Sequence, residues 1–266
     1  MIPTLDLGPY LAGSTEARDA LAAELRRIQE NIGFYVVVNH GVPQAPINRG
    51  YDALREFFAL PLEEKLKVKI DQSSVGYVPI RSTVYVTSKF NRNTKQDLNE
   101  TITIARERPL DDPDIQQGLR FVGPNRWPEG LKGFRDAMIA YQEALSTLGY
   151  AMLPLYALAL DLPSDYFEPY FTRPTWWTRN TYYPVVDPED NQFGISPHSD
   201  HGFVTLLPMS QVAGLEILGP DDEWIPAKPV HDGIIVNTGE FLNRWTNGRF
   251  LATPHRVMPP EEDRYS

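Results

Sequence analysis

Three short segments of the chain carry side chains whose types and spacing could bind a metal and an acid. The first two, His198-Ser199-Asp200 and Pro254-His255-Arg256, supply two imidazoles and one carboxylate. This is the ligand set that holds non-haem Fe(II) and leaves coordination positions open for other ligands. The third, Arg264-Tyr265-Ser266, adds a guanidinium that can pair with a carboxylate through two parallel hydrogen bonds. A metal site beside a carboxylate anchor indicates oxygenase chemistry more than a generic metal site.

The residues around these segments predict β-strands that would position the metal ligands. Residues 203–207 are β-branched and apolar, which is typical of a strand. Side chains two residues apart point to the same side of an extended backbone, so His198 and Asp200 could reach one ion together. Residues 249–253 lead into His255, which we expect on a separate strand. Ligands at the mouths of two strands are typical of a β-barrel or jelly roll.

The other three histidines have contexts that favour different roles. His201 directly follows the aspartate, so in a regular strand its side chain should point away from the metal. His231 precedes Asp232-Gly233 and is interpreted as a turn residue. His40 follows an apolar strand and is interpreted as a hydrogen-bonded structural residue. The metal site is therefore predicted from local context and not from the number of histidines.

The composition narrows the class of protein. The 266 residues are 42% hydrophobic, which is enough to bury a sizeable core. A net charge of -10 argues against non-specific nucleic-acid binding, which needs a basic surface. The absence of cysteine excludes disulfides and thiolate metal sites. The N-terminus lacks a signal-peptide pattern, and the most apolar stretch, residues 150–162, is too short to span a bilayer. We therefore expect a cytoplasmic protein that does not contact a membrane.

The order of predicted elements is α-rich first and β-rich second. Residues 14–32, 47–58 and 131–160 carry apolar side chains at helical spacing. Residues 34–38 form a short apolar strand, and short β segments separated by glycine and proline turns follow residue 176. The chain has no internal repeat and no low-complexity linker. The pattern predicts an α+β fold in which a long helix supports the β-rich part.

Several further motifs occur in a fixed order along the chain. They are Ile2-Pro3-Thr4-Leu5-Asp6-Leu7, residues 32–42, Asp97-Leu98-Asn99-Glu100, Tyr182-Tyr183-Pro184, Gly214-Leu215-Glu216-Ile217, Trp224-Ile225-Pro226, Val236-Asn237-Thr238-Gly239-Glu240 and Thr246-Asn247-Gly248. With the metal-ligand segments, they resemble the isopenicillin N synthase-like branch of the Fe(II)/2-oxoglutarate-dependent oxygenases. The resemblance runs from residue 2 to residue 266, and ordered motifs are far more specific than any one of them.

The resemblance implies a fold and a division of the chain. The fold would be a double-stranded β-helix, or jelly roll, with an α-rich N-terminal region and a long supporting helix. Residues 1–110 would form the N-terminal region, and residues 111–266 the helix and jelly roll, packed as one unit. Family members usually continue beyond the position of Ser266, so we expect the C-terminus of this chain to be shortened.

The resemblance also implies roles for individual residues. His198, Asp200 and His255 would bind Fe(II), with O₂ as the oxidant. Arg264, Ser266 and Tyr183 would bind the cosubstrate 2-oxoglutarate. Thr181 stands where the family often has Asn, and its hydroxyl could donate a hydrogen bond to the cosubstrate with a shorter reach. Residues proposed to line the substrate pocket are Arg81, Tyr85, Phe203 and Phe241.

The implied activity is oxidation of a C–H bond of a small molecule, by hydroxylation or desaturation, with release of succinate and CO₂. Two alternatives use the same fold: an Fe(II) oxidase that works without 2-oxoglutarate, and a non-catalytic binding protein. A structural Zn²⁺ would be a third, although three ligands with open positions and no cysteine argue against it. The substrate, the outcome of the oxidation and the oligomeric state cannot be derived from the sequence.

Overall fold

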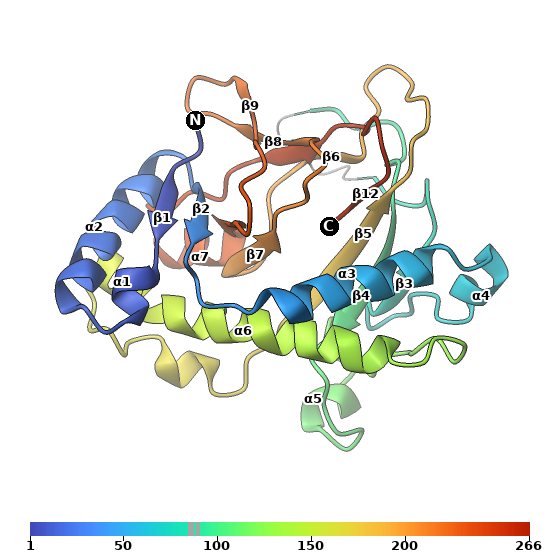
Figure 1. The fold of residues 1–266 in the computed structure, drawn as a ribbon, viewed down its shortest axis with the longest axis horizontal. Helices are drawn as coiled ribbons and strands as arrows, with labels where there is room; N and C mark the ends of the chain where they lie inside the picture. Colours follow the sequence, from blue (N-terminus) through green and yellow to red (C-terminus); the bar gives the residue numbers. More distant parts are fainter. Residues whose placement is uncertain (85–87, 89–90) are drawn as a thin grey trace.

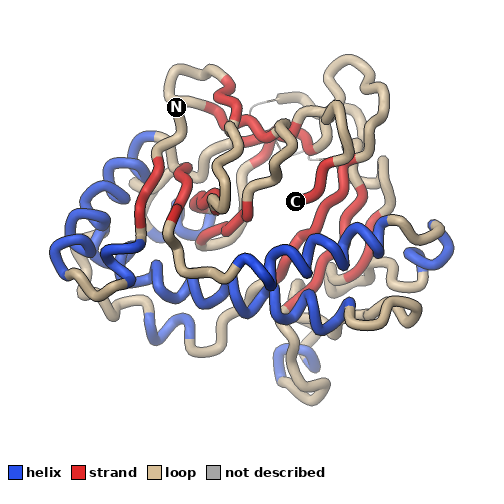
Figure 2. The backbone as a smooth tube through the Cα atoms, in the orientation of Figure 1, coloured by secondary structure: helices blue, strands red, loops and turns tan. Residues whose placement is uncertain are grey.

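The computed structural model describes residues 1–84, 88 and 91–266. The three longest helices lie beside one another on one side of the strands (Figure 1, Figure 2). The helices are α1 (Gly8–Leu11), α2 (Thr15–Asn31), α3 (Gln44–Phe58), α4 (Leu62–Leu66), α5 (Pro113–Gln116), α6 (Phe134–Ala159), α7 (Glu240–Trp245) and the short 3-10 helix η1 (Glu168–Phe171). The strands are β1 (Thr4–Asp6), β2 (Phe34–Val38), β3 (Gly76–Val78), β4 (Glu100–Ala105), β5 (Trp177–Tyr183), β6 (Ile195–His198), β7 (Val204–Pro208), β8 (Leu215–Leu218), β9 (Trp224–Pro226), β10 (Ile234–Thr238), β11 (His255–Val257) and β12 (Arg264–Tyr265).

The strands form three four-stranded sheets that enclose a common interior. Their orders are β1-β2-β10-β7, β6-β11-β8-β9 and β12-β5-β4-β3. One buried apolar cluster takes side chains from all three sheets, including Phe34, Tyr183, Ile195 and Ile217. Because strands from distant parts of the chain bury one face against the same cluster, the sheets together form a jelly roll. The α+β fold with a jelly-roll core, predicted from the sequence, is confirmed.

Helix α6 is the long supporting helix that was predicted over residues 131–160. It runs beside α3 and packs against both α2 and α3 (Figure 1). Its Gln142 side chain donates hydrogen bonds to the Ile104 carbonyl at 2.9 Å and to Thr178 Oγ1 at 3.1 Å, which fastens the helix to β4 and β5.

Among the described residues, no helix is both long and apolar enough to cross a membrane. The division at residue 110 stays a prediction.

The predicted boundaries of the other helices are close to those observed. Helix α2 begins after Ser14, whose hydroxyl accepts a hydrogen bond from the Ala17 amide at 3.1 Å and caps the first turn. Helix α3 begins at Gln44, three residues before the predicted start, because Pro43 precedes it with an extended backbone. Its apolar face, which includes Leu54 and Phe57, packs in the main core. Capping and periodicity therefore explain where these helices begin.

The approach to the second metal-ligand segment differs from the prediction. Residues 249–253 have no strand structure, and β11 begins only at His255. The Leu251 amide instead donates to the Gln29 carbonyl at 3.0 Å, and the Thr253 hydroxyl donates to the Ile32 carbonyl at 2.7 Å. Because its polar groups are bonded to the end of α2, the segment is not part of a sheet. His255 still lies on a strand separate from that of His198, as predicted.

Candidate active site

Two antiparallel strands bring the two predicted histidine ligands together. Strand β6 ends at His198 and strand β11 begins at His255, and these two residues are direct partners across the pair. Directly opposed residues of antiparallel strands project their side chains to the same face. The imidazole ring centroids are 4.4 Å apart as a result. Strand pairing therefore gives the first two ligands of the site.

Asp200 lies in the turn after β6 and completes the predicted triad. Its Oδ1 is 3.8 Å from His198 Nε2 and 3.6 Å from His255 Nε2. One candidate ligand atom from each of the three residues lies within 4.8 Å of the others. The structure thus brings together the three residues that the sequence predicted as metal ligands.

The second oxygen of Asp200 is held by two polar side chains of neighbouring strands. Oδ2 accepts a hydrogen bond from the Thr205 hydroxyl at 2.6 Å and from the Asn237 amide at 2.8 Å. The Asp200 carbonyl accepts from the Glu240 amide at 2.8 Å, at the start of α7. These contacts fix the carboxylate with Oδ1 towards the histidines, which is the supporting arrangement that orients a metal ligand.

The same hydrogen-bond logic orients both imidazoles. His198 Nδ1 lies 2.8 Å from the Ser196 carbonyl, and His255 Nδ1 lies 3.2 Å from the Thr253 carbonyl. A carbonyl can only accept, so each Nδ1 carries the hydrogen and each Nε2 presents a lone pair. Both lone pairs belong to the nitrogen atoms that face Asp200. The donor set therefore fits a divalent cation with nitrogen and oxygen ligands.

Electrostatics favour the protonation states that a metal requires. Burial, together with the nearby His255, lowers the pKa of His198 far below its ordinary value, so its imidazole is neutral. Burial alone would raise the pKa of Asp200, but the imidazoles of His255 and His198 and the two hydrogen bonds to Oδ2 outweigh it and lower the pKa. A neutral imidazole beside an ionised carboxylate is ready to coordinate without first releasing a proton.

A second cluster, deeper in the barrel, contains the predicted cosubstrate anchors. Arg264 is only 3% exposed, and its Nε donates to the Val212 carbonyl at 3.3 Å. Its guanidinium lies over the Tyr183 ring, with Cζ 4.9 Å from the ring centroid. The Ser266 hydroxyl donates to the Tyr183 hydroxyl at 3.4 Å. Three of the four predicted anchors are therefore in one place.

Arg264 has a buried donor that the described part of the chain does not satisfy. Its Nη1 has no hydrogen-bond partner among the described residues, although the atom is inaccessible to solvent. An unpaired buried cation is strongly unfavourable unless an anion reaches it. The fourth predicted anchor, Thr181, is buried on β5, and its amide donates to the Ser266 carbonyl at 2.6 Å. This corner therefore fits a carboxylate ligand.

The predicted substrate contacts are only partly brought to the metal. A cavity of about 590 Å³ includes His198 and Asp200, and Phe203 lines it as predicted. Phe241 does not: it lies on α7 with 58% of its surface exposed. Arg81 does not line the cavity either; it is exposed and its backbone has a positive φ. The prediction for Tyr85 falls outside the described residues.

The other three histidines are not part of the candidate metal-binding group, although His201 lines the same cavity as His198 and Asp200. His40 Nε2 lies 2.9 Å from the Asp232 carbonyl, and its Nδ1 accepts a hydrogen bond from the Val42 amide at 3.1 Å. His201 is exposed, and His231 is exposed in a turn. None of the three belongs to the group that could hold a metal ion.

Some residues of the site were not identified from the sequence. Asn237 is one, and its signal was a polar residue inside the otherwise apolar strand β10. Gly239 is another: a Cβ there would collide with the Gly202 backbone, so only glycine allows the close approach of the two turns. Arg179 on β5 is a third, because it lines the cavity with the metal ligands.

Comparison with known proteins places the same regions in known families. A model of the N-terminal region of non-haem dioxygenases in morphine synthesis matches residues 2–130, and a model of the 2OG-Fe(II) oxygenase superfamily matches residues 175–266. The 2-oxoglutarate-dependent dioxygenase tropC of Talaromyces stipitatus is 32% identical over 100% of this chain and 84% of its own length. A homoarginine-6-hydroxylase of Arabidopsis thaliana is 33% identical over 97% of this chain and 73% of its own.

Solved structures give the same result. The crystal structure of a full-length Neurospora crassa protein in complex with alpha-KG has a TM-score of 0.86 at 25% identity, covering 99% of this chain and 82% of its own. JOX2 in complex with 2OG, Fe and JA has a TM-score of 0.78 at 26% identity, covering 99% of this chain and 72% of its own. The similarity includes both the helical N-terminal region and the jelly roll.

Proposed function

Because the chain belongs to the 2OG-Fe(II) oxygenase superfamily, we propose that His198, Asp200 and His255 hold its catalytic Fe(II). The observation that carries this proposal is the convergence of one ligand atom from each residue within 4.8 Å. The fixed orientation of all three side chains supports it, since each uses its other polar atom in a hydrogen bond within the protein.

The protein is an Fe(II)- and 2-oxoglutarate-dependent dioxygenase that oxidises a C–H bond of a small molecule and releases succinate and CO₂. Three protein ligands would leave coordination positions of the metal open, and the metal would supply the redox chemistry that no side chain can perform. The protein has to hold the reactants in place and keep the site dry. Neither task requires a side chain to act as a general base.

We assign cosubstrate binding to Arg264, Ser266 and Tyr183, with Thr181 beside them. The unpaired Nη1 of Arg264 supports this assignment, because the distal carboxylate of 2-oxoglutarate would satisfy a donor that has no partner among the described residues. The Tyr183 ring under the guanidinium restricts its orientation. The cosubstrate would then be held by charge at one end, which leaves its other end for the metal.

Apolar side chains pack against one of the proposed metal ligands. Phe34 belongs to the buried cluster with Tyr183, Ile195 and Ile217, and its ring packs edge-on against the His255 ring at 5.2 Å between centroids. In such apolar surroundings, the charges of Asp200 and Arg264 act more strongly than they would in water. The apolar surroundings therefore strengthen the attraction between these side chains and charged reactants.

The partner of the site is a small molecule, as it is for the related enzymes. The net charge of -10 supports the prediction that the protein does not bind nucleic acid. A cytoplasmic location stays a prediction, which fractionation of cells that express the tagged full chain would test.

The direct test of the function is succinate release by protein loaded with Fe(II) without oxygen and then given O₂ and 2-oxoglutarate, with and without a mixture of small metabolites as the source of the C–H substrate. We expect succinate that rises with the mixture from the wild type and from His231→Ala, which changes an exposed histidine outside the cavity. We expect none above background from His255→Ala. Oxygen uptake without 2-oxoglutarate would instead support the oxidase alternative, and iron binding with neither product would support a binding protein.

A further inference from the structure

Strand β5 presents a row of side chains that leads from the cosubstrate corner to the mouth of the barrel. Tyr183 packs in the barrel interior, whereas the adjacent Tyr182 packs in the core on the helix side. Because side chains alternate along a strand, Thr181, Arg179 and Trp177 face the same side as Tyr183. On this face of β5, Arg179 is therefore the next side chain after the anchor Thr181, and Trp177 is the one after that.

Arg179 lies in the same cavity as two of the metal ligands. It lines this cavity together with His198 and Asp200. Arg179 is also exposed, so a molecule that enters the cavity can reach it.

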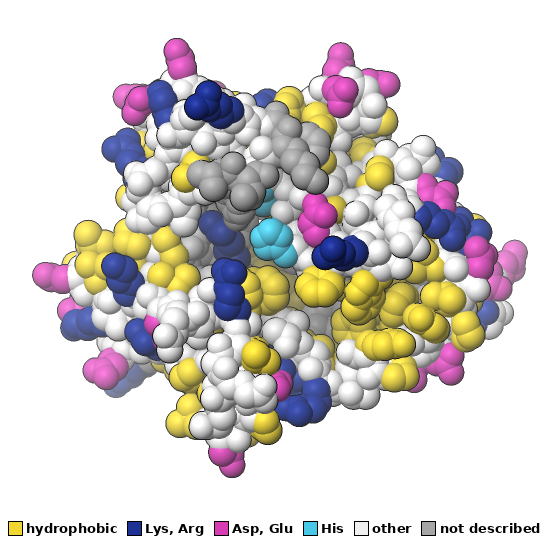
Figure 3. Space-filling view, turned by 180° about the vertical axis from the view of Figure 1, so that it is seen from behind, with side chains coloured by type: hydrophobic (Ala, Val, Ile, Leu, Met, Phe, Trp, Pro, Cys, Tyr) yellow, Lys and Arg dark blue, Asp and Glu magenta, His cyan; other side chains and the backbone are white. Residues whose placement is uncertain are grey.

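The charges around the cavity are unequal. Among the described residues that line it, the cationic side chains are Arg120 and Arg179, and the one side-chain carboxylate is Asp200. Asp200 is assigned to the metal, so the two arginines give the rest of the lining a positive potential. The protein as a whole has a net charge of -10, so this local excess is opposite to the general surface. Figure 3 shows histidine at the centre of this face, with basic and acidic side chains beside it and hydrophobic ones beyond.

An aromatic wall stands at the mouth of the same cavity. The rings of Phe121 and Trp177 are stacked, with centroids 4.3 Å apart and planes at 11°. The Arg120 guanidinium covers the Phe121 ring, with its Cζ 4.9 Å from the ring centroid. All three residues line the cavity and are only partly buried or exposed. The wall thus offers flat apolar surface with a cation at each side, Arg120 and Arg179.

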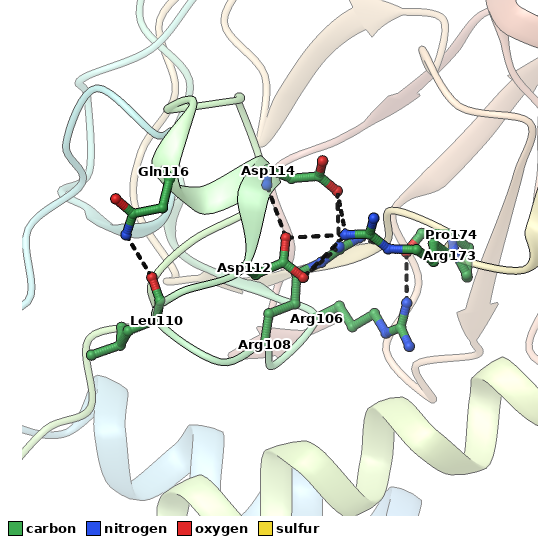
Figure 4. A network of polar contacts seen from close by, with 8 residues as sticks. All are labelled: Arg106, Arg108, Leu110, Asp112, Asp114, Gln116, Arg173 and Pro174. Carbon is green, nitrogen blue, oxygen red and sulfur yellow. Dashed lines mark hydrogen bonds and ion pairs between the residues drawn. The ribbon is translucent and has the colours of Figure 1, made fainter.

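The loop that carries α5 and leads to Phe121 is tied to the rest of the fold at two points. Arg108 has a side chain only 5% exposed, and its Nη1 lies 3.2 Å from Asp112 Oδ2 and 3.0 Å from Asp114 Oδ2. The exposed Arg173, on the segment that leads into β5, joins the same two carboxylates (Figure 4). After α5, the Phe121 amide donates to the Ser73 carbonyl at 2.7 Å. These contacts restrict the loop before and after α5.

We propose, on the basis of the function above, that the substrate is a carboxylic acid with a flat apolar body. Arg179 pairs with its carboxylate, and the Trp177–Phe121 stack packs against the body. A guanidinium and a carboxylate match in shape and can form two parallel hydrogen bonds. Arg120 adds positive potential at the other side of the wall.

The test measures binding and not turnover. Protein is loaded without oxygen with Fe(II) and 2-oxoglutarate, and each loading step is followed by calorimetry. Cinnamate, 2-naphthoate and indole-3-acetate are then titrated, each against its primary amide. We expect at least one acid to bind about 10-fold or more tightly than its amide, as for a charged hydrogen bond. In Arg179→Gln the preference should fall below about 3-fold, whereas Arg49→Gln, an exposed arginine on α3 outside the cavity, should leave it unchanged.

Two further variants separate the contributions. Trp177→Leu should weaken the acid and its amide by the same factor, because it removes stacking surface and no charge. Arg179→Gln should leave the affinity for 2-oxoglutarate within about 2-fold of the wild type, which separates substrate binding from a role in cosubstrate entry. Acids that bind no better than amides, or a preference that survives Arg179→Gln, would overturn the inference. Failure to load Fe(II) or 2-oxoglutarate would instead contradict the proposed function.

Discussion

Two arginines face the interior of the same barrel and differ in nearly every physical respect. Arg264 is buried and its guanidinium lies over the Tyr183 ring. Its Nη1 has no partner among the described residues. Arg179 lies four residues before Tyr183 on β5 and is exposed in the cavity. A buried cation needs an anion of fixed position, whereas an exposed one is stable in water and can serve variable ligands.

The contrast extends to the regions around the two arginines. The deep region contains the metal ligands and Arg264. Asp200 Oδ2 and Arg264 Nε form hydrogen bonds within the protein, which fixes the orientation of both side chains. The mouth, with Trp177 and Phe121, presents partly exposed rings and a guanidinium. The rigid deep region suits the cosubstrate, which the related 2-oxoglutarate-dependent dioxygenases share. The more exposed mouth suits the substrate, which differs between these enzymes. Substitutions in the deep region should therefore have larger effects.

The largest effect is expected from Asp200→Ala. Removing the carboxylate leaves two imidazoles, which hold Fe(II) much more weakly, so succinate formation should fall by on the order of 10³-fold or more. Iron content after desalting and the rate of succinate release measure the effect. Ser199→Ala is the matched control, since its hydroxyl bonds to Glu240 and not to Asp200. Full turnover by Asp200→Ala would refute the ligand assignment.

Arg264→Lys should produce the next largest effect. A lysine keeps the charge but loses the planar fork, so the KM for 2-oxoglutarate should rise by about 10- to 100-fold, in line with the loss of a charged hydrogen bond. The maximal rate should change much less. Steady-state succinate assays at varied 2-oxoglutarate measure both values, with Arg49→Lys as the exposed control. An unchanged KM would show that Arg264 is not the anchor.

Thr205→Val tests the support of the metal ligand and not the ligand itself. The change keeps the shape of the side chain and removes the hydrogen bond to Asp200 Oδ2. Loss of one such supporting contact typically lowers metal affinity by about 10-fold. Competition with an iron chelator measures the affinity, and circular dichroism verifies the fold. Wild-type affinity in the variant would mean that Asn237 alone orients the carboxylate.

Asp97→Asn tests stability and its pH dependence and not the reaction. Asp97 is fully buried and accepts two hydrogen bonds from Ser196 on one oxygen, while the other has no partner among the described residues. Burial raises its pKa from 3.8 to about 6. The folded protein therefore retains a proton that the unfolded chain loses, and its stability falls as pH rises from about 4 to about 6.

The asparagine variant cannot lose this proton, so its stability relative to the wild type should increase over the same pH range. The limit is about 3 kcal/mol, at about 1.36 kcal/mol per pKa unit. Urea unfolding at several pH values between about 4 and about 7.5 measures the difference. Asp111→Asn, at an exposed position, should show no such trend. A constant difference at all pH values would show that Asp97 does not titrate with a raised pKa.

The sequence predicted the elements whose information is local. Helix α2 has an apolar periodicity and a serine cap, and strand β7 has a run of β-branched and apolar residues, so both were found close to their observed bounds. The metal ligands were also predictable, because His198 and Asp200 are close along the chain and His255 lies in a recognisable segment. Local spacing was sufficient for these features.

The sequence could not predict the features that depend on contacts between distant segments. Phe241 was expected in the pocket from the resemblance to the family, but on the short helix α7 its side chain is exposed. Arg120 and Phe121 are far from β5 along the chain, yet the Phe121 ring stacks on Trp177. No periodicity or motif carries that information.

The residue types and their spacing along the sequence determined the chemistry, which needs two imidazoles, one carboxylate and an arginine. The order of α-rich and then β-rich segments was also set by the sequence. Tertiary structure decided which nitrogen of each imidazole faces the metal, because the Ser196 and Thr253 carbonyls hold the opposite nitrogen. It also decided that Arg264 is buried and Arg179 exposed, since burial depends on what packs around a residue and not on its neighbours in sequence.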